Sequence, residues 1–419
     1  MKILIKQATI IDPGGPWHDQ MVDVMVEHGV CTQLAPVLTD STAQVITSAH
    51  LHLSPGWMDL MPWSGEPGYE HRESLQSLAE AAAYGGYTAL APAPNTSPAV
   101  DNKSILHFIR TQAKTLPVDI YPLAAMTNQC QGKEISEMID LHHAGAKAFT
   151  DGLHSIQDSG LFLRALQYVR SFDGLIIHHP FDEPLAQKGQ IHEGEVSVSL
   201  GLRGINHLSE EIALHRDLAL LDYSGSRLHV LHLSTAGAVE LIRRAKQKNQ
   251  DLTSSAAVMN LVFDHLACQD FDVNYKVLPP LREATDRMAL VRGLEDGTID
   301  IITSHHVPHD DEAKILEFPY AEFGAGQLET AWSLFNTHYP HLLTKWVQAV
   351  AEQPRRLLKL EIPHIVPGQP ANFTFFDPQQ PWTVNGTDLR SKSKHNPCVG
   401  QNLKGKVIGT IVKGTLRLN

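Results

Sequence analysis

Apolar and polar residues alternate in short runs at both ends of the chain. The runs at 3–11, 22–36 and 43–55 read as strands separated by turns, and the same texture returns at 371–378, 381–386, 405–412 and 414–419. Because both terminal regions are rich in β segments, they are expected to pair. The pattern predicts a small β-sandwich domain built from residues 1–53 and 364–419.

The middle of the chain has a different pattern of apolar and polar residues, in which each apolar β segment is followed by a helical pattern. Leu75, Leu78, Ala79 and Ala82 share one helix face, and Gly85-Gly86 supplies a stop. The β segments lie near 57–61, 87–93, 118–124, 146–151, 174–179, 227–234, 251–257 and 299–306. Eight such units predict an α/β fold, a (β/α)₈ TIM-like barrel over residues 54–363.

Composition narrows the class of protein. The 34 basic and 46 acidic residues give a net charge of -12, which disfavours nucleic acid and anionic membranes as partners. The four cysteines are far apart and form no CxxC pair, which suits a reducing cytoplasm. No apolar run approaches the ~18 residues of a membrane span, and the N-terminus lacks signal-peptide features. A cytoplasmic globular protein is expected.

Candidate chemistry lies at the carboxyl ends of the predicted barrel strands, where such barrels place their sites. Asp151, His179 and His232 close three of the segments, and His305-His306 closes a fourth. Each alone could be a solvated or capping residue. Together, a carboxylate and imidazoles converging from separate strands are ligand types that suit zinc or a similar divalent ion.

Several stretches resemble the dihydroorotases of the long bacterial type and, more distantly, the hydantoinases. They include PGWMDL at 55–60, EPGYEHRES at 66–74, GGYTALAPAPNTSP at 85–98, GAKAFTDG at 145–152, RLHVLHLST at 227–235 and DGTIDIITSHHVPH at 296–309. The matches continue in one order to the segment 389–414. The resemblance implies an amidohydrolase-type barrel that opens a cyclic amide of pyrimidine biosynthesis at a two-metal site.

The metal residues that the resemblance implies are partly missing. Family members carry an HxH pair on the first barrel strand, where residues i and i+2 point to one side. Met61 and Trp63 stand at these positions, and neither is a plausible zinc ligand. The catalytic aspartate of the family is His305 here. Asp151, His179 and His232 match the family ligands of the second metal.

Most of the substrate-binding residues that the resemblance implies are also missing. The arginine that grips the substrate carboxylate is Gly65, the asparagine of the NPPLR-like segment is Leu278, and a PHH stretch has become residues near 255–257. Asn95, a further family contact, remains as a vestige.

Two hypotheses follow. The first is a non-catalytic dihydroorotase-like protein that acts as a structural partner of aspartate carbamoyltransferase, a role the resemblance implies, and that forms a homo-oligomer such as a dimer. The second is an active cyclic amidohydrolase with one divalent ion, zinc by preference, on Asp151, His179 and His232 with His305 as a fourth ligand. A hydantoinase is less well supported, because those sites use a lysine where this chain has Asp151. The sequence leaves the order of the 306–324 loop open.

Overall fold

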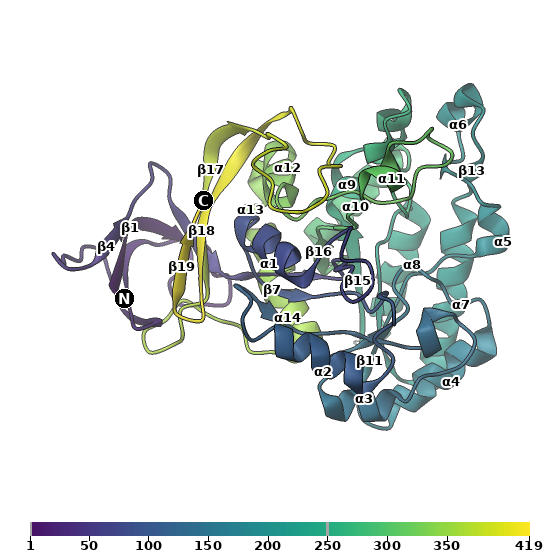
Figure 1. The fold of residues 1–419 in the computed structure, drawn as a ribbon, viewed down its shortest axis with the longest axis horizontal. Helices are drawn as coiled ribbons and strands as arrows, with labels where there is room; N and C mark the ends of the chain where they lie inside the picture. The colour runs from purple at the N-terminus through teal and green to yellow at the C-terminus, as the bar shows by residue number, and fades with distance from the viewer. Residues whose placement is uncertain (1, 249–250) are drawn as a thin grey trace.

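The computed structural model describes residues 2–248 and 251–419. Residues 1 and 249–250, which the predicted domains include, lie outside the described residues. The chain forms a strand-rich unit that carries both termini and, beside it, a larger unit of strands and helices (Figure 1). The α/β fold expected from the sequence is confirmed.

The two chain ends form a single sheet. Its strands are β1 (Lys2–Ile10), β2 (Met21–Glu27), β3 (Val30–Ala35), β4 (Gln44–Ile46), β5 (His52–Pro55), β17 (Phe373–Thr383), β18 (Asn402–Val412) and β19 (Thr415–Leu418). The order is β19-β18-β17-β5-β1-β2-β3, with β4 beside β1. The antiparallel pair β5–β17 joins the N-terminal strands to the C-terminal ones. The sandwich expected from the sequence is therefore one continuous hydrogen-bonded sheet, packed over its own apolar core.

Within the described residues, the barrel has eight parallel strand segments at the predicted positions. They are β6 (Trp57–Leu60), β7 (Tyr87–Ala91), β8 (Asp119–Ile120) continued by β9 (Ala124–Ala125), β10 (Phe149–Thr150), β11 (Leu175–His178), β14 (Arg227–Val230), β15 (Leu252–Ala257) and β16 (Ile301–Thr303). β8 pairs with β7 and β9 pairs with β10, so the third segment joins two sheets into one wall.

Helices follow the strands and cover the barrel. The longer ones are α1 (Leu75–Tyr84), α2 (Lys103–Gln112), α3 (Met138–Ala144), α4 (Ser159–Arg170), α7 (Leu208–Ser224), α8 (Ala236–Lys246), α10 (Ala284–Asp296) and α12 (Ala331–His338). The predicted first helix is confirmed as α1. Ser74 caps its start through a capping box, Gly85 ends it, and the four expected apolar residues are buried.

A side chain links the first and last strands of the barrel, β6 and β16. β6 and β16 share no strand ladder among the described residues. Instead, Asp59 on β6 accepts hydrogen bonds from the backbone N–H (2.8 Å) and the hydroxyl (2.5 Å) of Ser304, just after β16. Burial raises the pKa of Asp59 to about 7, although both bonds favour its charged form. This buried carboxyl thus links the first and last strands, and just beyond their ends the Trp63 N–H donates to the His306 carbonyl at 2.9 Å.

Two buried lysines fix the loop that follows β16. Lys276 Nζ donates to the carbonyls of Phe318 (2.7 Å), Pro319 (3.1 Å) and Ala321 (2.6 Å). Lys314, in the short helix α11 (Asp311–Lys314), donates to three further carbonyls. Burial lowers the pKa of both amines to about 8. Five backbone carbonyls between residues 318 and 324 are therefore bonded to these two amines.

Cys31, Cys130, Cys268 and Cys398 are all free and buried. Among the helices of the described residues, none has the length and apolarity needed to cross a membrane.

Candidate functional site

Three imidazoles gather at the carboxyl ends of the barrel strands. His179 follows β11, His232 follows β14 and His305 follows β16. The ring centroids of His232 and His305 lie 4.4 Å apart. All three side chains are buried, and burial lowers the pKa of His179 to about 3 and that of His305 to about 4. The strand ends therefore hold a cluster of neutral imidazoles.

Several ring nitrogens in this cluster lack partners within the described residues. His179 Nε2, His232 Nδ1 and both nitrogens of His305 are buried without a well-formed hydrogen bond. The Leu278 backbone lies close enough to His305 to oppose the lowering of its pKa by burial. The remaining nitrogens are engaged: His179 Nδ1 lies 3.3 Å from the Leu231 carbonyl, and His232 Nε2 lies 2.8 Å from Thr303 Oγ1.

The Asp151 carboxylate accepts hydrogen bonds from neighbouring residues of the barrel wall. One oxygen accepts from the backbone N–H groups of Met126 and Thr127, both at 2.9 Å, and the other accepts from the Thr127 hydroxyl. Burial nevertheless raises the pKa of Asp151. Within residues 2–248 and 251–419, no three His, Cys, Asp or Glu side chains are placed as a metal-binding group.

Met61 and Trp63 are part of the apolar barrel interior. Met61 is 1% exposed and packs in one cluster with Leu60, Ala89 and Ala91, and Trp63 packs against that cluster. Met61 also has a φ of 70°, a left-handed conformation that is strained for a side chain of this size. Apolar packing thus fills the positions where a pair of histidines would hold an ion. The residues present do not fit a two-metal site.

The backbone around Gly65 leaves no space for an arginine side chain. A Cβ at this position would lie 2.3 Å from the carbonyl oxygen of Tyr69 and 2.8 Å from that of Glu73. The Tyr69 N–H also donates to the Gly65 carbonyl at 2.6 Å, which closes a tight turn. The backbone after β6 is therefore folded over the space that a side chain at residue 65 would need.

The other predicted contact positions are separated. Asn95 Nδ2 donates to the Asp151 carbonyl at 3.0 Å, whereas its Oδ1 is buried without a partner. Ser255 accepts from the His232 backbone N–H at 3.2 Å, and Ala256 and Ala257 are buried. Leu278 lines an apolar cavity of about 430 Å³ together with Phe181, Ile205 and Phe323, so it does not join Asn95.

A separate cavity of about 310 Å³ lies at the barrel mouth. Trp63, Gly65 and Asn95 line it, together with Arg72 and His154. Sequence reasoning did not single out Arg72 or His154. Arg72 stands inside the matched stretch EPGYEHRES at 66–74, which was the available signal.

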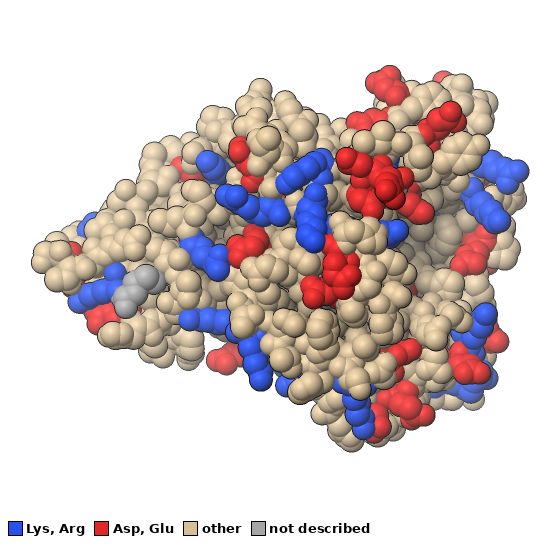
Figure 2. Space-filling view, viewed as in Figure 1, with Lys and Arg blue, Asp and Glu red and all other residues tan. Residues whose placement is uncertain are grey.

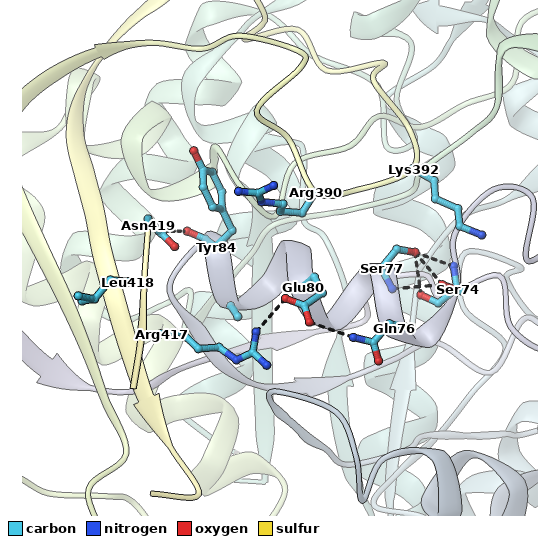
Figure 3. A pocket seen from close by; sticks show the side chains of 11 residues that line it. Ser74, Gln76, Ser77, Glu80, Tyr84, Arg390, Lys392, Arg417, Leu418 and Asn419 are labelled. Atoms are coloured by element: carbon cyan, nitrogen blue, oxygen red, sulfur yellow. Dashed lines mark hydrogen bonds and ion pairs between the residues drawn. The ribbon is translucent and has the colours of Figure 1, made fainter. Parts of the chain in front are cut away.

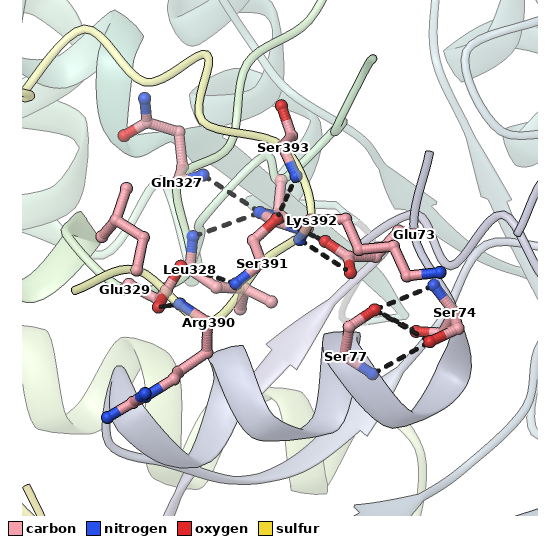
Figure 4. A network of polar contacts seen from close by, with 12 residues as sticks. Glu73, Ser74, Ser77, Gln327, Leu328, Glu329, Arg390, Ser391, Lys392 and Ser393 are labelled. Carbon is pink, nitrogen blue, oxygen red and sulfur yellow. Dashed lines mark hydrogen bonds and ion pairs between the residues drawn. The ribbon is translucent and has the colours of Figure 1, made fainter. Parts of the chain in front are cut away.

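A polar network ties the C-terminal segment to this region (Figure 4). Glu73 accepts from the Ser391 hydroxyl and the Lys392 backbone N–H, and its Oε2 lies 3.4 Å from His306 Nε2. Glu329 accepts from the backbone N–H groups of the same 390–391 segment, and burial raises its pKa to about 7. The matched segment 389–395 therefore serves to anchor the chain beside the barrel mouth.

The most voluminous cavity described, about 680 Å³, lies away from the strand ends. It is bounded by α1 and the C-terminal chain, with Arg390 stacked on Tyr84 and Arg417 paired with Glu80 at 3.0 Å (Figure 3). Lys and Arg side chains gather over this part of the surface, and an acidic group lies near α11 (Figure 2). This cavity contains none of the residues predicted for metal or substrate.

Solved structures share the fold. The chain superposes on the L-hydantoinase (dihydropyrimidinase) from Arthrobacter aurescens with a TM-score of 0.87 and 23% identity, covering 99% of this chain and 95% of that one. A dihydropyrimidinase from Brevibacillus agri gives a TM-score of 0.84 at 19% identity, covering 100% and 95%. The fold is that of the hydantoinase-type amidohydrolase barrels.

Sequence comparison identifies the family. Residues 51–238 match the family described as Dihydro-orotase-like. The dihydroorotase of Syntrophus aciditrophicus is 38% identical over 99% of both chains, and that of Pelotomaculum thermopropionicum is 38% identical over 99% of this chain and 98% of its own. The chain belongs to the dihydroorotase-like family, as its motifs predicted.

Proposed function

We propose that this chain is a non-catalytic member of the dihydroorotase-like family that supports a partner protein. The observation that carries the proposal is the packing of Met61 and Trp63 on the barrel interior, where two metal-binding histidines would stand. Hydrolysis of a cyclic amide at neutral pH depends on an activated water, and a bound divalent ion lowers the pKa of water from about 15.7 to about 7.

Two further features support the loss of catalysis. The carboxylate of Asp151 is occupied by three donors from residues 126–127, and His305 stands in place of the family's catalytic aspartate. The turn over Gly65 excludes an arginine from the position where the family grips its substrate.

The proposed partner is aspartate carbamoyltransferase, and the proposed state of the chain is a homodimer within such an assembly. Support comes from the family resemblance together with the altered site. A protein that keeps the fold but not the catalytic groups can still bind a partner through its surface. Sedimentation of the purified chain, alone and mixed with the aspartate carbamoyltransferase of the same organism, tests both points. A stable complex at micromolar concentration is expected, and two independently sedimenting species would contradict the partnership.

Catalysis is tested by elemental analysis of the purified protein paired with a dihydroorotate hydrolysis assay, before and after zinc is added. No stoichiometric metal and no turnover are expected. Turnover that rises with one bound ion per chain would overturn the proposal.

A second candidate is favoured by the unpartnered ring nitrogens of His179, His232 and His305. Imidazole nitrogens are common zinc ligands, so the donor chemistry suits one ion even though the side chains are not assembled around a point. When bound, such an ion would supply an activated water. Replacing His305 with Ala discriminates the candidates, because only a metal-dependent enzyme would lose bound zinc and turnover together.

A further inference from the structure

We infer that the chain pairs with a second copy of itself through a surface formed by residues 311–322, which include α11, and residues 390–394. Such a pairing rests on the homodimer proposed above and gives it a contact surface. Acidic side chains near α11 and basic side chains beside them lie on one face of the molecule (Figure 2).

Residues 311–322 carry exposed carboxylates next to exposed apolar side chains. The carboxylates are those of Asp311, Glu312, Glu317 and Glu322. Within the described residues, only Asp311 among them has an ion-pair partner, His395 Nε2 at 2.9 Å. Ile315 is 70% exposed, Leu316 47% and Tyr320 72%. The segment therefore offers a partner both negative charge that is not neutralised and apolar surface.

The backbone of this segment is fixed before any partner binds. The buried amines of Lys276 and Lys314 donate to its carbonyls. Phe318, which is buried, lies with its ring centroid 5.4 Å from Lys276 Nζ. Because the segment does not have to be ordered on association, binding through it loses little conformational entropy. Exposed apolar side chains on such a backbone suit a contact surface.

Residues 390–394 carry the opposite charge. Arg390, Lys392 and Lys394 are exposed. The Lys392 amine donates to the Glu70 carbonyl at 2.6 Å, and the Lys394 amine donates to two nearby carbonyls. These acceptors are neutral, and no ion pair joins any of the three cations to a carboxylate in the part of the chain that the structure describes. Their positive charge is therefore free to meet an acidic surface.

The two segments are neighbours across one cavity. Asp311 and Glu312 line this cavity of about 460 Å³ from the first segment, and Lys392 and Lys394 line it from the second. A two-fold axis that runs between the segments, in the plane of contact, places the acidic segment of each copy over the basic segment of the other. The surface is therefore complementary to itself.

Electrostatics favours this orientation over other contacts between two copies. Each chain carries a net charge of -12, so two copies repel each other over most of their surfaces. Where the acidic segment faces the basic one, the local interaction is attractive, and two-fold symmetry makes it occur twice. A partner with a surface of a single sign could pair with only one of the two segments. A second copy of the chain pairs with both.

Charge exchange tests this pairing by sedimentation of the full chain. Wild-type protein is expected to sediment as a dimer at micromolar concentration. Asp311→Lys with Glu312→Lys makes the first segment basic, and Lys392→Glu with Lys394→Glu makes the second acidic. Each variant alone should dissociate with a Kd raised roughly 100-fold, because like charges then face each other. An equimolar mixture of the two variants should form a heterodimer, since basic segments again meet acidic ones.

Two further variants separate the surface from general effects of charge. Asp222→Lys with Glu361→Lys makes the same change in net charge at exposed acids of other segments, and this variant should dimerise as wild type does. Tyr320→Ser removes exposed apolar surface without a change in charge and should weaken the dimer by about 10-fold. Circular dichroism of each variant establishes that it is folded.

Three results would overturn the inference: a monomeric wild type, charge variants that dimerise as tightly as wild type, or a mixture of folded variants that stays monomeric. The second result would leave the proposed homodimer standing and place its contact elsewhere. Metal content, hydrolysis and the binding of aspartate carbamoyltransferase are measured separately. Failure of this surface is therefore distinguishable from failure of the proposed function.

Discussion

Restoring the missing histidines tests whether apolar packing at Met61 and Trp63 has replaced a metal site. The variant is Met61→His with Trp63→His. Met61 is 1% exposed, and exchanging it for His removes apolar burial worth about 1.5–3 kcal/mol. A buried imidazole without a partner costs about 1–3 kcal/mol more. The first substitution alone should therefore lower the free energy of unfolding by roughly 2.5–6 kcal/mol, against a typical total of about 5–15 kcal/mol.

Urea denaturation with and without zinc measures this effect. Zinc should not recover the lost stability, because the Asp151 carboxylate remains bonded to residues 126–127. Dihydroorotate hydrolysis should remain absent for the same reason. Met288→His, at a side chain 48% exposed on α10, is the control and should leave stability unchanged. The reasoning is refuted if excess zinc restores the stability of the double variant and brings turnover with two ions per chain.

Three further predictions concern stability. Thr127→Val removes the hydroxyl that donates to Asp151 and should cost about 1–3 kcal/mol in urea denaturation, whereas Thr127→Ser should not. Lys276→Met leaves three carbonyls of the adjoining loop unbonded, so amide hydrogen exchange should accelerate in 311–324 while the barrel strands stay protected. Burial lowers the pKa of His229 to about 3, below the unfolded value of about 6.5, so the unfolded chain binds the extra proton as pH falls through that window. His229 should therefore cost stability below about pH 6.5, by roughly 2 kcal/mol between pH 7 and 5, and urea midpoints of His229→Gln should depend less on pH there. An unchanged slope in that variant would contradict the assignment.

Much of the fold was predictable, because strand and helix periodicity are local properties of the chain. The eight barrel segments and α1 lie where the pattern of apolar residues put them. The expected pairing of the two chain ends is also confirmed, since both ends carried strand patterns without helical ones. Family motifs likewise identified the strand-end residues.

The side-chain partnerships were not predictable, because they join residues that the sequence separates widely. Nothing in the pattern around Asp151 indicates that its oxygens bond to residues 126–127, just after the neighbouring strand β9. The contact of Glu73 with Ser391 and His306 joins three distant segments. Gly65 reads as a lost arginine in sequence, and only the folded turn reveals that its Cβ position is occupied.

The pairing of β5 with β17 has a consequence for synthesis. The barrel strands are complete once β16 has been made, but the edge of β5 that faces away from β1 stays unpaired until residues 373–376 of β17 have left the ribosome. The apolar cluster that contains Ile3 and Ile5 therefore stays incomplete until Phe373 and Phe375 have been made. We expect chains that stop before β17 to expose an unpaired strand edge and to aggregate, however well their barrel has folded. Strand β17, which is made late, thus covers the edge of β5, which is made early.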